Sequence, residues 1–275
     1  MLSKIFRNPI DVWPALLVTG LFAVLMCMYL YMDNLWLMSL LSFLLLIPRL
    51  SVVGYNHNHV HTMTFKSPTL NRLFEILMFF ETGTSPHSGT LNHIIGHHAC
   101  YFDPSIDTLN TRRADGSTLG RHEFSFRAAL WHYPSCITLS RGKRELRMKF
   151  IGWAVVCLAL LAAVIAYKPA AAMIVFVVPM LIMLYMLKWS AWAHHSGLPM
   201  GDDHTASRSH TGKLYNMLTW NAGYHAAHHF RQALHWSKLP DYHAELAAKI
   251  PAELSGHGWG PTFPPRLAPR DLQAG

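Results

Sequence analysis

The sequence predicts an all-α membrane protein, with four transmembrane helices in two hairpins and a helical cytoplasmic cap that carries groups of histidines. Hydrophobic residues make up 51% of the 275 residues and charged residues only 14%, against about 25% charged residues in soluble domains. The apolar residues also gather in four long stretches. The net charge of +8 is explained by basic residues that flank these stretches, so no nucleic-acid partner is expected.

Each apolar stretch comes close to the roughly 20 residues that a spanning helix needs. Only Asp33 and Asn34 separate the first stretch from the second, and only Lys168 separates the third from the fourth, so the stretches pair into two hairpins. Pro179 lies inside the last stretch, where a neighbouring helix can supply the donor that a backbone carbonyl loses. The predicted spans cover about residues 12–32, 35–53, 150–167 and 169–187.

Basic residues predict the orientation of the chain. Most lysines and arginines lie between the hairpins or after the fourth span, whereas the two tight turns on the other face carry only Lys168. Because these residues accumulate on the cytoplasmic side, both termini and the cap are expected in the cytoplasm. We expect one membrane domain over residues 1–275, with a cap over 54–149 and 188–259, a cap helix over 70–80 and an irregular tail over 260–275.

All 19 histidines lie in the two segments that this topology assigns to the cytoplasm. Three groups (HNHVH, HIIGHH and HAAHH) have spacings of three or four residues, and a His-His pair follows the fourth span. Residues three or four apart share one helix face, so each group can aim two imidazoles at one point. These histidines are His57, His61, His93, His97, His98, His194, His195, His225, His228 and His229.

The number of imidazoles indicates which kind of metal site they form. Neutral imidazole suits iron, zinc, copper and nickel, and a zinc site takes at most four protein ligands. Eight or nine imidazoles are enough for two metals. A membrane zinc hydrolase is the less favoured alternative, because the sequence has no HExxH motif and no acidic residue inside a group. A metal transporter should place polar ligands at mid-membrane, which the apolar stretches do not offer.

The other histidines are expected to be surface or hydrogen-bonding residues, with His59 evenly balanced between that role and the metal site. Four polar residues next to the histidine groups are hypothesised to orient the imidazoles that bind metal. These four residues are Asn92, Asp103, Asp107 and Asn221.

The order and spacing of the histidine groups resemble the membrane fatty acid desaturase and alkane hydroxylase superfamily. The third group lies in NAGYHAAHHFRQALHWSKLPDYH (221–243), which is similar to the NxGYHxxHH and WxxLP pattern of acyl-lipid and sphingolipid desaturases. The second group lies in HIIGHHACYFDPSID (93–107), which is closer to the alkane-hydroxylase branch. The resemblance covers roughly residues 12–243.

This resemblance implies an oxidoreductase in which two iron ions are held by histidine and activate O2 against a C–H bond of a lipid or hydrocarbon from the bilayer. It assigns the histidines of the three groups as ligands, together with one histidine of the His-His pair. The family's Glu-His-Tyr-Gly-Leu favours His195 for that position, whereas counting from the end of the span favours His194. We lean to His195.

The implied reaction depends on which group is compared. The third group favours a fatty acyl or lipid desaturase, and the second favours a hydroxylase or decarboxylase acting on a fatty acid, an alkane or another lipid. The sequence contains no His-Pro-Gly-Gly of a cytochrome b5 module and no rubredoxin-like CxxC pair. Electrons are therefore expected from a separate donor of the ferredoxin, rubredoxin or cytochrome b5 type, with its reductase.

Overall fold

The computed structural model describes residues 2–101, 103–198 and 201–256, and this part of the chain is mostly helical. Its strands β1 (Ser209–His210) and β2 (Ser255–Gly256) form one short parallel pair. The predicted tail over 260–275 lies outside the described residues. The α-helices are α1 (Leu2–Ile5), α2 (Val12–Tyr31), α3 (Leu35–Leu44), α4 (Leu46–His61), α5 (Pro68–Thr82), α6 (Arg121–Leu130), α7 (His132–Leu139), α8 (Arg144–Tyr167), α9 (Pro169–Ala172), α10 (Val178–His195), α11 (Lys213–Leu218), α12 (His225–Phe230) and α13 (Leu239–Leu246).

Shorter helical turns connect these helices. Two of them, η2 (Thr90–Ile95) and η4 (Met173–Val177), are π-helical. The others are 3-10 turns: η1 (Pro9–Asp11), η3 (His98–Cys100), η5 (Trp236–Lys238), η6 (Ala247–Lys249) and η7 (Ala252–Leu254).

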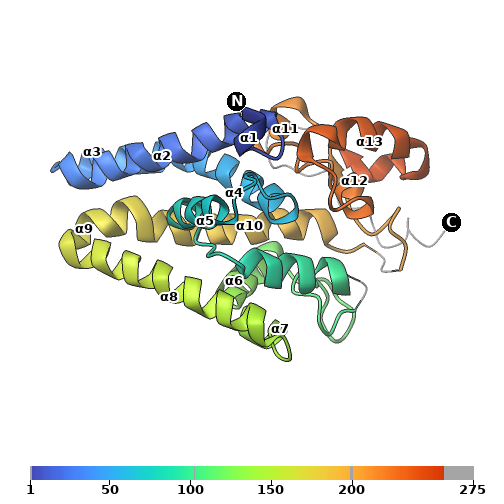
Figure 1. Cartoon of the computed structure of the whole chain (residues 1–275). Coiled ribbons are helices and arrows are strands. Elements are labelled where there is room, and N and C mark those ends of the chain that lie inside the picture. The colour runs from blue at the N-terminus through green and yellow to red at the C-terminus, as the bar shows by residue number, and fades with distance from the viewer. Residues whose placement is uncertain (1, 102, 199–200, 257–275) are drawn as a thin grey trace.

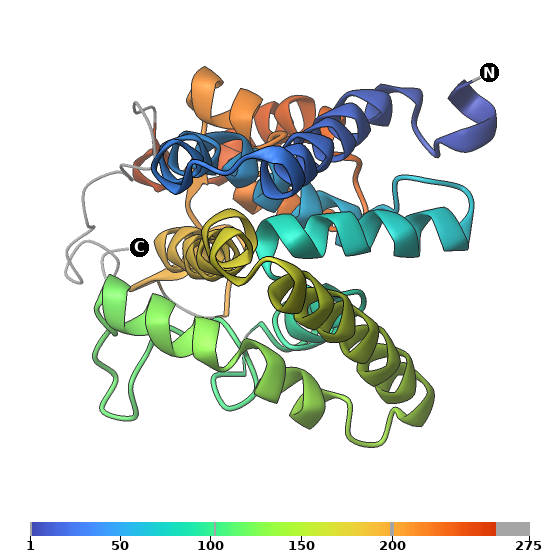
Figure 2. The same ribbon diagram turned by 90° about the vertical axis from the view of Figure 1, so that its left-hand side faces the viewer.

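The helices form three layers (Figures 1 and 2). Helices α2, α3 and α4 lie on one side, α5 and α10 lie in the middle, and α6, α7 and α8 lie on the other side. The α2–α3 turn and the α8–α9 turn lie at the same end of the molecule, and α11, α12 and α13 lie toward the opposite end (Figure 1). The middle layer is therefore covered on both faces, and its helix α10 leads from the turns toward the opposite end.

Three helical stretches are long and apolar enough to cross a membrane: Pro9–Tyr31, Arg144–Tyr167 and Pro169–His195. The pair α3 and α4, bent by 45° at a short break, makes a fourth if it is counted as one span. Helices α4 and α10 continue past the predicted second and fourth spans, α4 to His61 and α10 to His195. Hydropathy marks only the apolar part of a helix, and both helices continue through polar residues that are equally able to form backbone hydrogen bonds.

Pro179 interrupts the fourth span, and the second span provides the missing donors. An N–H at position 179 would serve the carbonyl of Ile174 in a π-helical pattern or that of Val175 in an α-helical pattern. The Ser42 hydroxyl donates to the Ile174 carbonyl at 2.7 Å, and the Arg49 guanidinium donates to the Val175 carbonyl. The predicted satisfaction of the freed carbonyl by a neighbouring helix is confirmed.

The helix predicted over 70–80 is confirmed as α5, with local signals at both ends. The Ser67 hydroxyl accepts a hydrogen bond from the Leu70 N–H, and Pro68 occupies the first turn, where its missing N–H costs nothing. Gly83 ends the helix with a φ of 78°, a left-handed conformation that glycine adopts without strain. The helix packs between α2, α4 and α10 rather than on the surface.

Candidate metal centre

The first histidine group lies near the end of α4, where His57 and His61 are one helical turn apart. Gly54 lets this helix approach the turn that precedes α12, because a Cβ at position 54 would lie only 2.8 Å from the Cα of Thr219. The close approach is held by the Asn58 side chain, which donates to the Trp220 carbonyl at 2.9 Å. The first and third histidine groups therefore face each other at short range.

The second group does not lie on an α-helix, although its spacing suggested one. His93 lies in the π-helical turn η2, where the Gly96 N–H bonds to the Leu91 carbonyl five residues back, and His98 begins the 3-10 turn η3. His97, between these turns, has a φ of −121° and a ψ of −70°. The side chains of His93 and His98, rather than those of His93 and His97, consequently point to the same place.

The third group lies on α12, after a strained turn. Trp220 and Asn221 have φ values of 53° and 63°, which are unusual for residues with a side chain. Gly223 follows, and a Cβ there would lie 2.3 Å from the His210 carbonyl oxygen, so no larger residue fits without a shift. This turn aims His225, His228 and His229 at the end of α4 and at the second group.

Nine histidines form two buried or half-buried groups, in each of which the ligand atoms all lie within 4.8 Å of one another. The five-histidine group consists of His57, His61, His93, His98 and His228, and the four-histidine group consists of His97, His195, His225 and His229. The second and third sequence groups each contribute to both. Each sequence group does aim two imidazoles at one point, but in the second group these are His93 and His98, and the remaining histidines His97 and His228 each serve the other metal-binding group.

Short contacts between ring nitrogens define the centre of each group. The Nε2 atom of His98 lies 3.0 Å from Nε2 of His93 and 2.9 Å from Nε2 of His228. In the other group, Nε2 of His225 lies 2.8 Å from Nε2 of His195 and 3.2 Å from Nε2 of His229. One nitrogen carries at most one proton, so these convergent contacts cannot all be hydrogen bonds.

Protein oxygens fix the orientation of two of these rings. The Nδ1 atom of His97 lies 2.8 Å from Oδ1 of Asp107, and Nδ1 of His195 lies 3.0 Å from the Tyr101 hydroxyl and 3.3 Å from the Ala206 carbonyl. An Nδ1–H that donates to oxygen leaves the Nε2 lone pair directed into the group. Two neighbouring nitrogens that bind one metal ion at about 2.1 Å lie about 3 Å from each other. The distances between Nε2 atoms in each group are similar to this value, so both groups fit a transition metal ion.

Burial keeps these histidines in the neutral form that binds metal. Burial, and secondarily the neighbouring histidines, hold the pKa values of His93, His97, His225, His228 and His229 well below the usual 6.5. The same causes lower the pKa of His98 to about 3. At neutral pH the lone pairs are therefore available to a metal without loss of a proton.

The structure separates the two histidines that compete for the last ligand position. His195 belongs to the four-histidine group. His194 lies outside both groups: its Nδ1 atom lies 2.7 Å from the Arg208 carbonyl oxygen, and its ring stacks on His225 with 4.2 Å between the ring centroids. The geometry therefore favours His195 as the ligand, with His194 packed against the ring of His225.

Of the four residues hypothesised to orient imidazoles, only Asp107 contacts a histidine of either group. Asp103 accepts hydrogen bonds from Ser105 instead, because a local turn offers a nearer donor. The amide of Asn92 contacts Ser135 and Lys188, and that of Asn221 donates to the Trp236 carbonyl. The hypothesis was therefore wrong for these three, because adjacency in sequence does not determine side-chain direction in turns.

Sequence reasoning missed Tyr101, whose hydroxyl contacts the His195 ring from 94 residues away. No spacing rule links the two residues, since the contact arises where the η3 turn meets the end of α10. The only signal in the sequence is that a tyrosine with a hydrogen-bonding hydroxyl follows directly after the second histidine group.

Most of the remaining described histidines make hydrogen bonds, as expected. His59 belongs to them, because its Nδ1 atom lies 2.7 Å from the Thr64 hydroxyl and its Nε2 atom 3.3 Å from Glu75. His132 and His243 have no side-chain hydrogen bond among the described residues, and His132 differs from His243 in that both of its ring nitrogens are buried. His132 is buried, and neither of its ring nitrogens has a hydrogen-bond partner among the described residues. His257 lies outside the described part of the chain.

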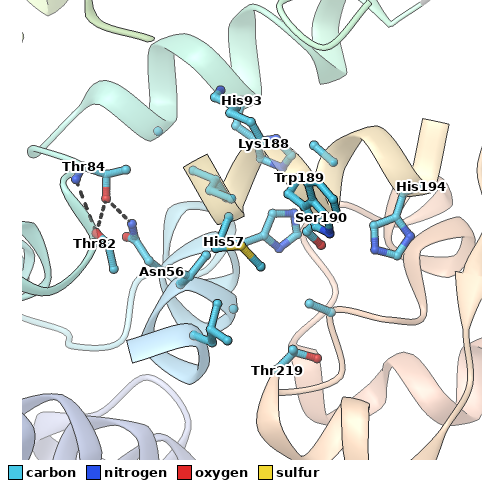
Figure 3. Close-up of a pocket in the computed structure, with 18 of the residues that line it drawn as sticks. Asn56, His57, Thr82, Thr84, His93, Lys188, Trp189, Ser190, His194 and Thr219 are labelled. Atoms are coloured by element: carbon cyan, nitrogen blue, oxygen red, sulfur yellow. Dashed lines mark hydrogen bonds between the residues drawn. The ribbon is translucent and has the colours of Figure 1, made fainter. Parts of the chain in front are cut away.

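A cavity of about 240 Å³ adjoins the histidine groups. Its wall includes His57, His93 and His225, together with apolar side chains from α4, α10 and α11. Figure 3 shows His57, His93, Lys188 and Trp189 among the residues that line the cavity. A molecule in the cavity would therefore lie directly against histidines of both groups.

A family model described as fatty acid desaturase matches residues 34–260. No curated protein and no solved structure gives a match.

Proposed function

Because the chain belongs to the fatty acid desaturase family, we propose that it is an O2-dependent di-iron oxidoreductase that introduces a C=C bond into a fatty acyl chain. The observation that carries the proposal is the junction of two histidine groups with a mainly apolar cavity. Two irons bound by the nine histidines would supply the activation of O2. The two groups together offer more imidazoles than one zinc ion can use.

The residues of the chain have three tasks in this proposal. The nine histidines, with their imidazole rings neutral, would hold the metals. Asp107 orients the ring of His97, and Tyr101 orients that of His195. The apolar wall of the cavity positions the substrate and excludes water. Desaturation converts –CH2–CH2–, O2, two electrons and two protons into –CH=CH– and two water molecules. The two electrons come from a separate ferredoxin-, rubredoxin- or cytochrome b5-type donor with its reductase.

A second outcome at the same site is hydroxylation or decarboxylation, which the likeness of the second histidine group to alkane hydroxylases favours. Hydroxylation converts C–H, O2, two electrons and two protons into C–OH and one water molecule. It adds one oxygen atom to the substrate, whereas desaturation removes two hydrogen atoms. Mass spectrometry of lipids and hydrocarbons after expression in a host without related enzymes separates the two reactions.

Metal analysis tests the proposal directly. Purified protein reconstituted anaerobically with ferrous iron should bind about two irons per chain, and turnover should require both O2 and an added electron donor. Substitution of His57 or His229 by alanine should lower the iron content, since each belongs to one of the two groups. One zinc per chain with no iron uptake, or full turnover without an electron source, would overturn the proposal.

The proposed orientation puts both termini and the histidine groups in the cytoplasm. The distribution of lysine and arginine supports this. Tyr31, Trp36 and Tyr167 are also exposed around the two turns at the opposite end of the molecule, where an aromatic belt at the outer membrane surface would lie. Fusion of a reporter to the C-terminus tests it, because green fluorescent protein should fluoresce there and alkaline phosphatase should remain inactive.

A further inference from the structure

Helix α10 carries a lysine in the interior of the protein. Lys188 is only 3% exposed and lies seven residues before His195, hence on the same face of the helix and two turns away. A charged side chain in a membrane helix is costly, and such residues face a partner or a functional cavity. Lys188 lines the cavity that His57 and His93 also line (Figure 3).

The ammonium group of Lys188 is attracted by the more distant Asp107 but has no ion-pair partner among the described residues. Its Nζ atom donates to Oδ1 of Asn92 at 2.7 Å, and this is its one hydrogen bond among the described residues, although an ammonium has three donors. None of the ion pairs in the described part of the chain includes Lys188. The Asp107 carboxylate is engaged by His97 and by the Leu109 N–H.

His132 provides a second unused polar group in the same wall. Its side chain is 2% exposed, both ring nitrogens lack a partner within the described chain, and it lines the cavity. Burial, and then the charge of Lys188, hold the pKa of His132 well below its usual value, so the neutral ring retains one N–H donor. The Asn92 amide joins the two residues, because its nitrogen lies 3.5 Å from the His132 carbonyl oxygen and its oxygen accepts from Lys188.

Apart from the histidines of the two metal-binding groups, the rest of the cavity wall does not offer such groups. Asn56, Thr82 and Thr84 are polar, but they hydrogen-bond to one another (Figure 3). The exposed lining residues are apolar, with Leu214 at 41% and Leu218 at 38%, and both lie on α11. The cavity wall therefore combines an exposed apolar side with a buried cation that has no ion pair, which is the polarity of a fatty acid.

We propose that Lys188 and His132 bind the carboxylate of a free long-chain fatty acid in this cavity. The carboxylate provides the negative charge that Lys188 lacks and accepts the N–H of His132, and the hydrocarbon chain extends toward Leu214 and Leu218. This inference rests on the proposed di-iron oxidation and specifies its substrate class as a free acid rather than an ester or a thioester.

Equilibrium binding to the full-length, iron-loaded protein in lipid nanodiscs tests this inference without catalysis. Radiolabelled palmitate and methyl palmitate are compared, with binding to empty nanodiscs subtracted. Lys188→Met removes the charge and keeps the length of the side chain, and Lys168→Met in the outer turn, where Nζ bonds to the Leu30 carbonyl, is the matched control. Iron content and the melting temperature are measured for each variant, and His132→Phe is the second variant.

We expect the unsubstituted protein and Lys168→Met to bind palmitate at least about tenfold more tightly than methyl palmitate, since a charged hydrogen bond is lost in the ester. Lys188→Met should abolish this preference, and His132→Phe should weaken palmitate binding about threefold. Unchanged palmitate binding by Lys188→Met, or an equal loss for the ester, would overturn the carboxylate site. Failure of the proposed function is a separate result, namely that no acyl substrate is oxidised by the iron-loaded protein with O2 and electrons.

Discussion

Replacement of Arg49 by methionine should destabilise the protein, because this one side chain satisfies three backbone carbonyls in its interior. Arg49 has no exposed surface and donates to the carbonyls of Phe80 at 3.1 Å and Glu81 at 3.2 Å, and to that of Val175. Hydrogen bonds inside membrane proteins contribute about 0.6 kcal/mol on average and at most about 1.7 kcal/mol. Bonds to a charged donor lie above this average, so three bonds of about 1 kcal/mol each give an expected loss of about 3 kcal/mol.

The Glu81 side chain adds to this loss. It is fully buried, neither carboxylate oxygen has a hydrogen-bond partner in the described chain, and burial raises its pKa against the opposing charge of Arg49. Without the guanidinium, Glu81 must be protonated or remain as an unpaired charge. Arg49→Met should therefore unfold at a lower SDS fraction in mixed micelles, as followed by circular dichroism, whereas Arg144→Met on the surface should change stability by less than about 0.5 kcal/mol.

Pro179→Ala provides an internal check of the mechanism. Alanine restores an N–H near the Val175 carbonyl, so it should recover about 1 kcal/mol more in the Arg49→Met background than in the unsubstituted protein. An Arg49→Met variant as stable as the unsubstituted protein, or an equal effect of Pro179→Ala in both backgrounds, would refute the argument that Arg49 serves the carbonyl freed by the proline.

Three further outcomes follow from the histidine groups and the cavity. Asp107→Asn should weaken iron binding about 10- to 100-fold, because His97 loses the carboxylate that orients it; unchanged affinity in a chelator competition would contradict this. His195→Ala should lower the iron content, whereas His194→Ala should retain about two irons per chain, and the reverse pattern would exchange their roles. In the folded protein the pKa of His132 lies below the value of about 6.5 expected for the unfolded chain. The folded state therefore binds fewer protons than the unfolded state, and the protein loses stability as pH falls below about 6.5. His132→Phe should therefore be less sensitive to acid, by about 1.4 kcal/mol between pH 7.5 and 5.5, and equal acid sensitivity of both proteins in unfolding titrations would show that His132 is not buried in neutral form.

The sequence predicted those features that depend on long-range composition or on local helix rules. Apolar stretches predicted where the long helices lie, and Pro179 predicted a carbonyl in need of a donor. The sequence did not identify Arg49 as that donor, because the contact between Arg49 and the Val175 carbonyl depends on how α4 packs against η4. The same limit applies to Lys188, which follows directly after the predicted fourth span and therefore resembled an ordinary basic flank of a membrane helix.

The histidine site was predicted by residue type but not by arrangement. The spacing rule assumes an α-helix with about 3.6 residues per turn, whereas His93 lies in a π-helical turn and His98 in a 3-10 turn. With a different period, His97 turns away from its neighbours and joins His195. His132 was expected at the surface or in a hydrogen bond, and its burial follows from the cavity, which is formed by segments from several parts of the chain.

The division of adjacent histidines between the two groups has a mechanical consequence. His97 and His98 belong to different groups, and so do His228 and His229, so two single peptide units, each about 3.8 Å between Cα atoms, bridge one group to the other. The spacing between the groups is thereby set by covalent geometry rather than by the packing of helices. Changes in bilayer thickness or helix tilt can widen or narrow the cavity near α11, but they leave the distance between the two histidine groups nearly constant.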